Sequence, residues 1–396
     1  MKTRSFALMR FCYLAASIGI VWGVAFLSAR AYAEESLATQ LREAVQPSVE
    51  SGKIAGAVVM VANRETVLLA ETLGWADVEA KKPMRTDTVF WIASQSKPIT
   101  AAAVMILVDE GRIKLDDPVE VYLPEFKNLW VVSEKDEEHI LLKKTDRPVT
   151  VKDILSHTSG LPFKSALESP TLDVFPLAAR VRSYMMTPLD FQPGTRYQYS
   201  NAGINLAGHI VEVVSGEPFE KFLQERLFAP LEMRDTTFWP SENQVARLAK
   251  AYRRDQATGR LVEIQIDQLA YPLNDRQKRF PIPAGGLFST AEDLVHFYQM
   301  LLNGGTYRGR QILSQAAVAA MTSRQTPLSV AQSYGLGLVI NGPFFGHGGS
   351  HGTNTLADRE SGMIFVWLVQ HAGPESGQAF QKVDRIFGEW SAKMRQ

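Results

Sequence analysis

The 396-residue chain is predicted to adopt an α+β fold, with one antiparallel sheet assembled from segments at both of its ends. Short apolar runs typical of strands lie near both ends, whereas helical spacing of apolar residues dominates the middle. The composition, 45% hydrophobic and 21% charged, is ordinary for a globular protein with a large core. Periodicity alone predicts only this mixture of helices and strands.

The N-terminus has the order typical of a secretory signal peptide. Residues 1–10 carry three cations and no acid, Phe11–Ser28 is almost wholly apolar, and Ala31-Tyr32-Ala33 is a small-residue cleavage site. We expect residues 1–33 to be removed after Ala33 and the protein to be secreted, in a periplasm. The alternative is an uncleaved membrane anchor, since the apolar stretch is long enough to approach a membrane span.

The first elements of the mature chain alternate between helix and strand signals. Leu37–Val49 has helical spacing, and Gly56–Ala62 is a short apolar run typical of a buried strand. Thr66–Thr72 is expected to be its hairpin partner. Phe90–Ala93 then leads into a helix from Ser94 to about Gly111, and this helix is expected to present one apolar face, formed by Ile99, Ala102, Ala103 and Ile106.

The middle of the chain, from about Lys114 to Leu302, is mainly helical in pattern, with long irregular connections. Within it, the charged stretch Asn128–Arg147 is expected to be an exposed insertion. Near the end, three strands and a closing helix are predicted, in the order Tyr334–Ile340, Phe345–Thr355, Met363–Gln370 and Gln378–Met394.

A serine and a lysine lie three residues apart at the start of the predicted helix. Ser94 and Lys97 therefore share one helix face, which puts an amine within reach of a hydroxyl. A serine hydroxyl needs such a neighbouring base to become a nucleophile. Apolar neighbours favour burial of Lys97, and burial lowers the pKa of an amine. The simpler interpretation is an N-cap serine beside a surface lysine.

Two further segments add to this pair, namely Tyr199-Ser200-Asn201 and His347-Gly348-Gly349-Ser350. Together with Ser94-Gln95-Ser96-Lys97 they resemble the three motifs of the penicillin-recognising serine hydrolases, S-x-x-K, Y-x-N and K-T-G. The nearest resemblance is to the class C β-lactamase branch, with its esterase and DD-carboxypeptidase-like relatives. Val149–Pro162 and Pro283–Leu294 are also similar to segments of that branch, and the resemblance extends from about Leu37 to Trp390.

The resemblance implies a role for each motif residue. Ser94 is expected to be the nucleophile, with Lys97 and Tyr199 taking and returning protons and His347 assisting near neutral pH. Asn201 is expected to bind the lysine and a substrate amide or ester, and Gly349 to let substrate approach the strand. The backbone N–H groups of Ser94 and Ser350 are expected to form the oxyanion hole.

The implied architecture is α+β, with helices on the faces of an antiparallel sheet built from both termini. It forms a β-lactamase/transpeptidase-like catalytic domain over residues 34–396, with a helical lobe inserted at about 114–302. The expected activity is acyl transfer through a Ser94 acyl-enzyme, on esters or amides. Gly348 replaces a threonine that helps β-lactamases to bind the substrate carboxylate. The alternatives are a DD-carboxypeptidase or D-aminopeptidase, a true β-lactamase, and a catalytically silent sensor or binding protein on the same scaffold.

Other classes of function have little support in the sequence. No basic stripe favours nucleic acid, the formal net charge is zero, and the only cysteine is Cys12, inside the leader. Glycines make a helical metal pair of His347 and His351 unfavourable, so no metal and no cofactor is expected. His157 is interpreted as a structural histidine. Gly348–Gly352 also matches G-x-S-x-G, so an elbow-type hydrolase with Ser350 as nucleophile is a further alternative. The expected partner is a small ester, amide, D-amino-acid peptide or β-lactam, with the oligomeric state open.

Overall fold

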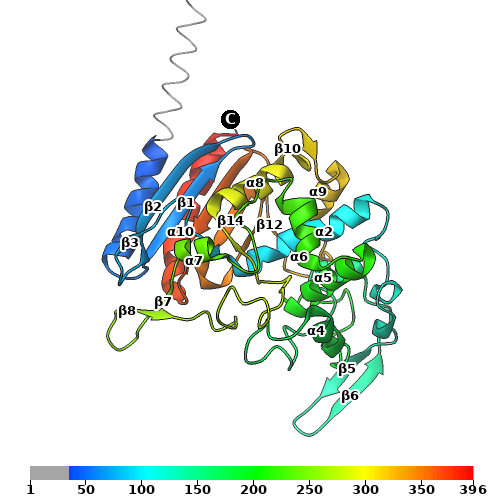
Figure 1. Ribbon diagram of the computed structural model, residues 1–396. Helices are drawn as coiled ribbons and strands as arrows, with labels where there is room; N and C mark the ends of the chain where they lie inside the picture. The colour runs from blue at the N-terminus through cyan, green and yellow to red at the C-terminus, as the bar shows by residue number, and fades with distance from the viewer. Residues whose placement is uncertain (1–34, 396) are drawn as a thin grey trace, which may run out of the picture.

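The computed structural model describes residues 35–395 and is built on one seven-stranded sheet (Figure 1). The strand order is β12-β13-β14-β15-β1-β2-β3. Near its centre, β1 (Gly56–Ala62) pairs antiparallel with β15 (Met363–Leu368), so the two ends of the chain meet as predicted. The other strands are β2 (Val67–Asp77), β3 (Lys82–Pro83), β12 (Val339–Asn341), β13 (Phe344–Gly348) and β14 (Asn354–Asp358).

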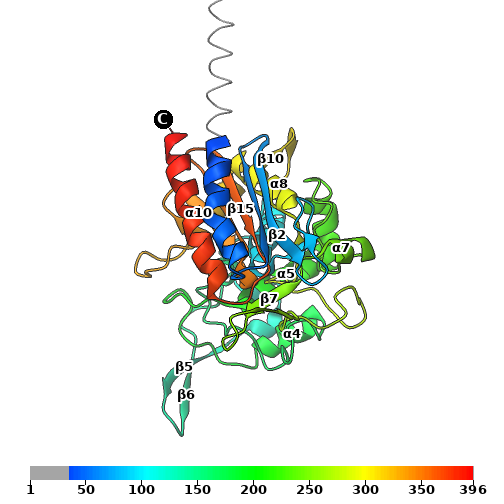
Figure 2. The same cartoon turned by 90° about the vertical axis from the view of Figure 1, so that its left-hand side faces the viewer.

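Two helices cover the outer face of this sheet. They are residues 35–50 and α10 (Pro374–Lys393), which lie side by side across the strands (Figure 2). In β1, alternate residues serve the two faces, because successive side chains of a strand point in opposite directions. Val59 packs in the cluster with Leu41 and Phe387 of these helices, whereas Met60 packs in the larger core on the other face.

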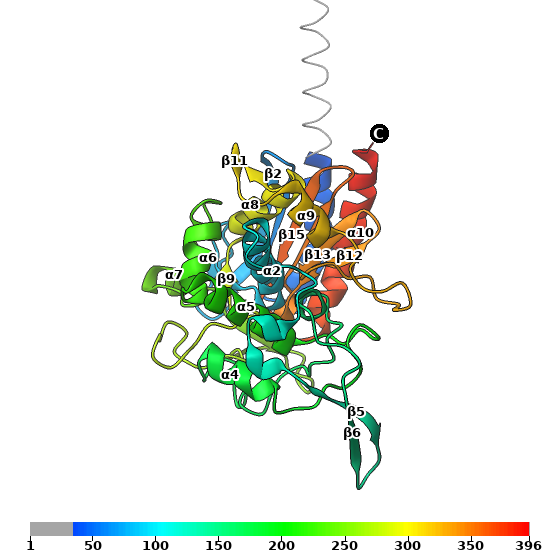
Figure 3. The same ribbon diagram turned by 90° about the vertical axis from the view of Figure 1, so that its right-hand side faces the viewer.

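The opposite face of the sheet is covered by α8 (Ala291–Leu302) and α2 (Ser96–Asp109) (Figure 3). The apolar face predicted for α2 is buried, and so is every other residue from Ser96 to Leu107. The helix lies between the sheet and the lobe, with β13 on one side and α5 (Asn201–Ser215) on the other, so only its last two residues reach solvent. A helix surrounded by protein needs no polar face.

The middle of the chain forms the predicted helical region but also contains two hairpins. Its short helices are α3 (Val151–Leu155), α4 (Leu177–Tyr184), α6 (Phe219–Leu223) and α7 (Glu242–Arg247). The hairpins are β5 (Trp130–Lys135) with β6 (Ile140–Lys144), and β7 (Ala251–Arg254) with β8 (Leu261–Ile264). The remaining elements are β4 (Phe90–Trp91) with β9 (Phe288–Ser289), β10 (Thr306–Tyr307) with β11 (Arg310–Gln311), and α9 (Gln315–Thr322).

The predicted strand Phe345–Thr355 is in fact two strands. β13 ends at Gly348, the chain reverses through a 3₁₀ turn at Ser350–Gly352, and β14 returns antiparallel from Asn354. The reversal uses left-handed backbone at His351 (φ 65°) and Gly352 (φ 87°), a conformation that interrupts a strand. Ser350 therefore lies on a turn between strands, not inside one.

The predicted leader, residues 1–33, lies outside the described residues. Within residues 35–395, none of the helices combines the length and the apolar character that a bilayer crossing requires.

Candidate active site

Ser94 lies in a short 3₁₀ turn, Ala93–Gln95, immediately before α2. Ala93 has left-handed backbone (φ 47°), a strained conformation for a residue with a Cβ and one that is concentrated at functional sites. The preceding Trp91 is held on both sides, since its backbone N–H donates to Gln370 Oε1 (3.0 Å) and its indole to Gly285 O (2.8 Å). Ser94 itself is partly exposed, so a solute can reach its hydroxyl.

Lys97, on the first turn of α2, is fully buried beside that hydroxyl. Its Nζ lies 3.0 Å from Ser94 Oγ, 2.9 Å from Asn201 Oδ1 and 2.7 Å from Ala284 O. No carboxylate of the described chain forms an ion pair with it, and burial lowers its pKa well below the usual 10.5. A neutral amine has two protons and one lone pair. As an ammonium, Lys97 donates to Ser94 Oγ and to both carbonyl oxygens; as a neutral amine, it can keep the two carbonyl bonds and turn its lone pair to Ser94.

Tyr199 lies on the other side of the amine. Lys97 Nζ is 4.5 Å from the centre of the tyrosine ring. Burial raises the pKa of the Tyr199 hydroxyl, and the nearby Ser94 hydroxyl opposes part of this rise, so the phenol stays protonated and can donate a hydrogen bond. The hydroxyl, the amine and the phenol predicted from two of the three motifs thus lie together.

Asn201 is the first residue of α5, and its side chain is turned inward to Lys97. The N-cap of the helix is Ser200, whose Oγ accepts from Gly203 N at 3.0 Å. Asn201 Oδ1 accepts from Lys97, which leaves the amide nitrogen as the free donor of this side chain.

His347 lies on β13 with both ring nitrogens occupied by protein. Nδ1 is 2.5 Å from Gly348 O, which accepts its proton, so Nε2 is the acceptor for the Tyr334 hydroxyl at 3.0 Å. Tyr334 in turn lies 3.2 Å from Nε2 of His157, whose Nδ1 accepts from Ser200 N. Burial lowers the pKa of His347 to about 3, so the imidazole stays neutral. It is near Tyr199, 6.0 Å between ring centres, but without a free N–H.

Tyr334 was missed by sequence reasoning, because a tyrosine at the start of a predicted strand carries no motif. The structure gives it a connecting role: it is fully buried and joins the loop of His157 to the strand of His347. The interpretation of His157 as a structural histidine agrees with this position, since its ring ties the Val149–Pro162 segment to the N-terminus of α5 through Ser200.

A second set of missed residues lies behind Lys97. Asn205, one turn after Asn201 on α5, accepts from Ala284 N (3.0 Å), and Ala284 O is the acceptor for Lys97. The Asn205 amide donates to Glu168 Oε1 (3.1 Å), which also accepts from Tyr184. The only sequence signal was the i, i+4 spacing of the two asparagines on one helix face. This network fixes the carbonyl that orients the lysine.

Gly349 and Ser350 begin the turn opposite Ser94. Ser350 and Ser94 each lie in the first turn of a 3₁₀ helix, where backbone N–H groups have no acceptor within the helix. Within the described residues, the N–H groups of Ser94 and Ser350 donate to no other acceptor either. Gly349 packs directly against the strand end before Ser94. A Cβ there would lie 2.3 Å from Ile92 O and 2.3 Å from Thr353 Oγ1. The glycine is thus needed for this close approach, not only to admit substrate.

Substitution of that glycine gives a first test. In Gly349→Ala, the new methyl group must push Ser350 away from Ser94, and the two N–H groups separate. We expect kcat to fall by about 10²–10³, the usual cost of one lost oxyanion donor. Steady-state kinetics on p-nitrophenyl acetate measures this, and Gly377→Ala, where no atom lies within 4 Å of the added Cβ, is the control. Unchanged kcat in Gly349→Ala would contradict the assigned geometry.

The elbow alternative is wrong for Ser350. A nucleophile elbow needs a strand, a sharp turn and then a helix. Here Ser350 lies between two antiparallel strands, β13 and β14. Its hydroxyl is 3.2 Å from Nδ1 of the following His351 and accepts from Gln268 Nε2 at 3.3 Å.

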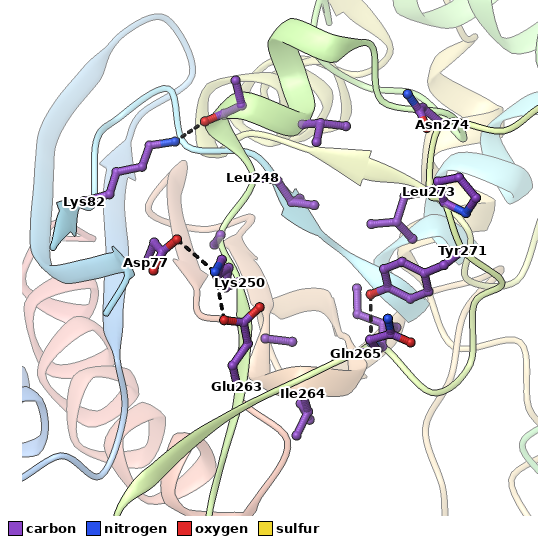
Figure 4. A pocket seen from close by; sticks show the side chains of 16 residues that line it. Asp77, Lys82, Leu248, Lys250, Glu263, Ile264, Gln265, Tyr271, Leu273 and Asn274 are labelled. Carbon is purple, nitrogen blue, oxygen red and sulfur yellow. Dashed lines mark hydrogen bonds and ion pairs between the residues drawn. The ribbon is translucent and has the colours of Figure 1, made fainter. Parts of the chain in front are cut away.

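A separate cavity of about 460 Å³ lies between α7, the β7–β8 hairpin and residues 271–274 (Figure 4). Its walls include Leu248 and Leu273, and at one end Lys250 lies between Asp77 (3.0 Å) and Glu263 (2.8 Å). None of the seven predicted site residues lines it. Within residues 35–395, no group of three or more His, Cys, Asp or Glu side chains is arranged to hold a metal ion.

Comparison with known proteins gives one family over most of the chain. Residues 41–385 match the β-lactamase family. The protein Rv1367c of Mycobacterium tuberculosis is 33% identical over 355 residues, which are 81% of this chain and 87% of that protein. Esterase EstB of Burkholderia gladioli is 34% identical over 233 residues, 56% of each chain.

Among solved structures, EstCE1, described as a hydrolase with promiscuous acyltransferase activity, superposes with a TM-score of 0.75. It is 25% identical, and the match covers 90% of this chain and 99% of EstCE1. The α+β architecture described above is thus that of known β-lactamase-like and esterase structures.

Proposed function

This chain belongs to the β-lactamase family, as a hydrolase related to esterases and acyltransferases, and from that premise we propose a secreted serine hydrolase that works through a Ser94 acyl-enzyme. The observation that carries the proposal is the environment of Lys97. Burial lowers the pKa of this amine, no carboxylate of the described chain pairs with it, and its Nζ lies 3.0 Å from the Ser94 hydroxyl. In the proposed enzyme the amine is neutral and its lone pair accepts the serine proton. This supports Lys97, rather than a tyrosinate, as the primary base.

In the proposed reaction, Ser94 Oγ bonds to the substrate carbonyl carbon while its proton passes to Lys97. The oxyanion is bound by the N–H groups of Ser94 and Ser350. When the bond to the leaving group breaks, Tyr199 donates a proton to that group, and Lys97 returns its proton to the phenolate. Water then attacks the acyl carbon, the same groups take its proton, and Ser94 leaves as a hydroxyl.

We propose uncharged esters as the main substrates. His347 is neutral and both of its nitrogens are engaged, and Gly348 has no hydroxyl, so this edge of the site lacks the donors that bind a substrate carboxylate. The loop next to Tyr199 carries partly exposed apolar side chains. The rings of Phe163 and Tyr199 are stacked with their centres 6.3 Å apart, and Leu167 and Phe175 come later in the same loop. The names of EstB, an esterase, and of EstCE1, a hydrolase with promiscuous acyltransferase activity, agree with this choice.

Mass spectrometry of the intact protein tests the proposal directly. After brief exposure to p-nitrophenyl butyrate at low pH to slow deacylation, we expect one added acyl group, mapped to the peptide that contains Ser94. Nitrocefin and a D-Ala-D-Ala peptide, run in parallel, test the β-lactamase and carboxypeptidase alternatives. No adduct with any of them would support a silent binding protein. An N-terminus at Glu34 in the exported protein would support secretion.

Tyr199→Phe tests the proposed general acid. We expect a loss of about 10²–10⁴ in kcat for ethyl esters, because an alkoxide is a poor leaving group without a proton donor. For p-nitrophenyl esters, whose leaving group needs no proton, we expect a much smaller loss in the acylation rate. Stopped-flow measurement of both substrates gives the comparison, and Tyr197→Phe is the matched control. Equal losses for both leaving groups would refute this role.

A further inference from the structure

The β5–β6 hairpin extends away from the rest of the protein in all three views (Figures 1–3). It is a sheet of two strands only, and no strand of the described chain pairs with the outer edge of β6. An isolated hairpin of this kind is only marginally stable in water, and an unpaired edge is a template for another strand. A partner strand would therefore stabilise the hairpin, and the unpaired edge of β6 can form backbone hydrogen bonds with it.

The side chains of this edge are apolar in the middle and charged at both ends. Ile140 is 56% exposed and Leu141 is 57% exposed, which is unusual for neighbouring large aliphatic residues. Glu137 and Glu138 precede them in the turn, and Lys143 and Lys144 follow.

The charges at the two ends form no ion pairs within the described residues. Glu137, Glu138 and Lys143 form no ion pair within residues 35–395. Lys144 lies over the ring of Trp130 at 3.5 Å and donates to Asn128 O, again without a carboxylate. The segment thus carries two acids, an apolar centre and two lysines, all of them available to a partner.

We propose that this edge binds the same edge of a second copy of the chain. In an antiparallel pair related by a two-fold axis between Ile140 and Leu141, residues equally far from the axis face each other. Ile140 of one copy then faces Leu141 of the other. By the same count, the acidic turn at Glu137 and Glu138 lies beside Lys144 and Lys143 of the other copy.

The order of charges along the segment favours a second copy of the chain over a uniformly charged partner. The segment is antisymmetric in charge about its own centre, which makes it complementary to itself in the antiparallel direction and to no uniformly charged surface. An anionic membrane would attract the lysines but repel the acidic turn. Pairing also turns two isolated hairpins into one four-stranded sheet, β5-β6-β6-β5, which removes two unpaired edges.

A charge-exchange experiment tests the proposal. In E137K/E138K the segment is entirely basic, and in K143E/K144E it is entirely acidic, so each variant repels itself. We expect sedimentation equilibrium to show dimers for the unmodified protein and a dissociation constant raised at least about tenfold for each variant alone. Mixing the two variants restores opposite charges at both ends of the pair, and we expect dimers to return in the mixture. Far-UV circular dichroism and Tm check that both variants are folded.

Three results would overturn the proposal. One is a monomeric unmodified protein at the highest attainable concentration. Another is a dimer that neither variant weakens, which would mean a different interface. The third is a monomer that sediments with phosphatidylglycerol vesicles unless Lys143 and Lys144 are replaced, which would assign the hairpin to a membrane surface.

Discussion

Ser94→Ala is expected to lower kcat/KM for p-nitrophenyl esters by about 10⁴–10⁶, the loss seen when a serine nucleophile is removed from a hydrolase. The physical reason is that the acyl-enzyme needs an oxygen at this position, and no other hydroxyl can replace it. Ser94 Oγ is in contact with both Lys97 and Tyr199, which bracket the proton that must leave. A pre-steady-state burst, expected for the unmodified enzyme, is expected to vanish in the variant.

Ser350→Ala is the matched control for Ser94→Ala. It removes an exposed hydroxyl on the opposite side of the site but keeps the backbone N–H proposed for the oxyanion hole. We expect this variant to retain the burst and most of its activity. A Ser94→Ala variant with unchanged turnover, or a Ser350→Ala variant without a burst, would assign the reaction to a different group.

Lys97→Met is expected to combine a loss of about 10⁴–10⁶ in kcat with a change in how stability depends on pH. The folded protein holds Lys97 neutral, because burial lowers its pKa well below 10.5, whereas the unfolded chain binds a proton there up to about pH 10.4. Below that pH and above the folded pKa, the unfolded state therefore carries one proton more than the folded state. In this pH range the free energy of unfolding of the unmodified protein rises by about 1.4 kcal/mol per pH unit.

The methionine variant has no such proton. The difference in free energy of unfolding, unmodified protein minus Lys97→Met, is thus expected to increase from pH 7 to pH 9 by that slope. Urea denaturation at both pH values measures it, and Lys135→Met, which removes an exposed lysine of the hairpin, is the control. A flat difference would mean that Lys97 is charged in the folded protein, and the proposed base would then be wrong. Protonation of Lys97 would also remove the proposed base. We therefore expect kcat/KM to fall as the pH drops through the pKa of Lys97 in the folded protein.

Local spacing in the sequence was enough for part of the site. The three-residue separation of Ser94 and Lys97 predicted their contact, and a single helical turn delivers it. Strand β1 was predicted with its observed bounds, Gly56–Ala62, because a buried central strand is apolar throughout. The apolar face predicted for α2 is buried, but the pattern of the helix did not reveal that protein covers its other sides as well.

What the sequence by itself determined was the set of chemical groups and their family, since motifs and short-range periodicity are properties of neighbours along the chain. What only the tertiary structure decided was the state of those groups. Burial lowers the pKa of Lys97, whose Nζ donates to carbonyl oxygens of Asn201 and Ala284, 104 and 187 residues away, and His347 lacks a free N–H because Tyr334 and Gly348 occupy its ring. Protonation and hydrogen-bond direction depend on burial and on partners from distant segments, and only folding brings those segments together.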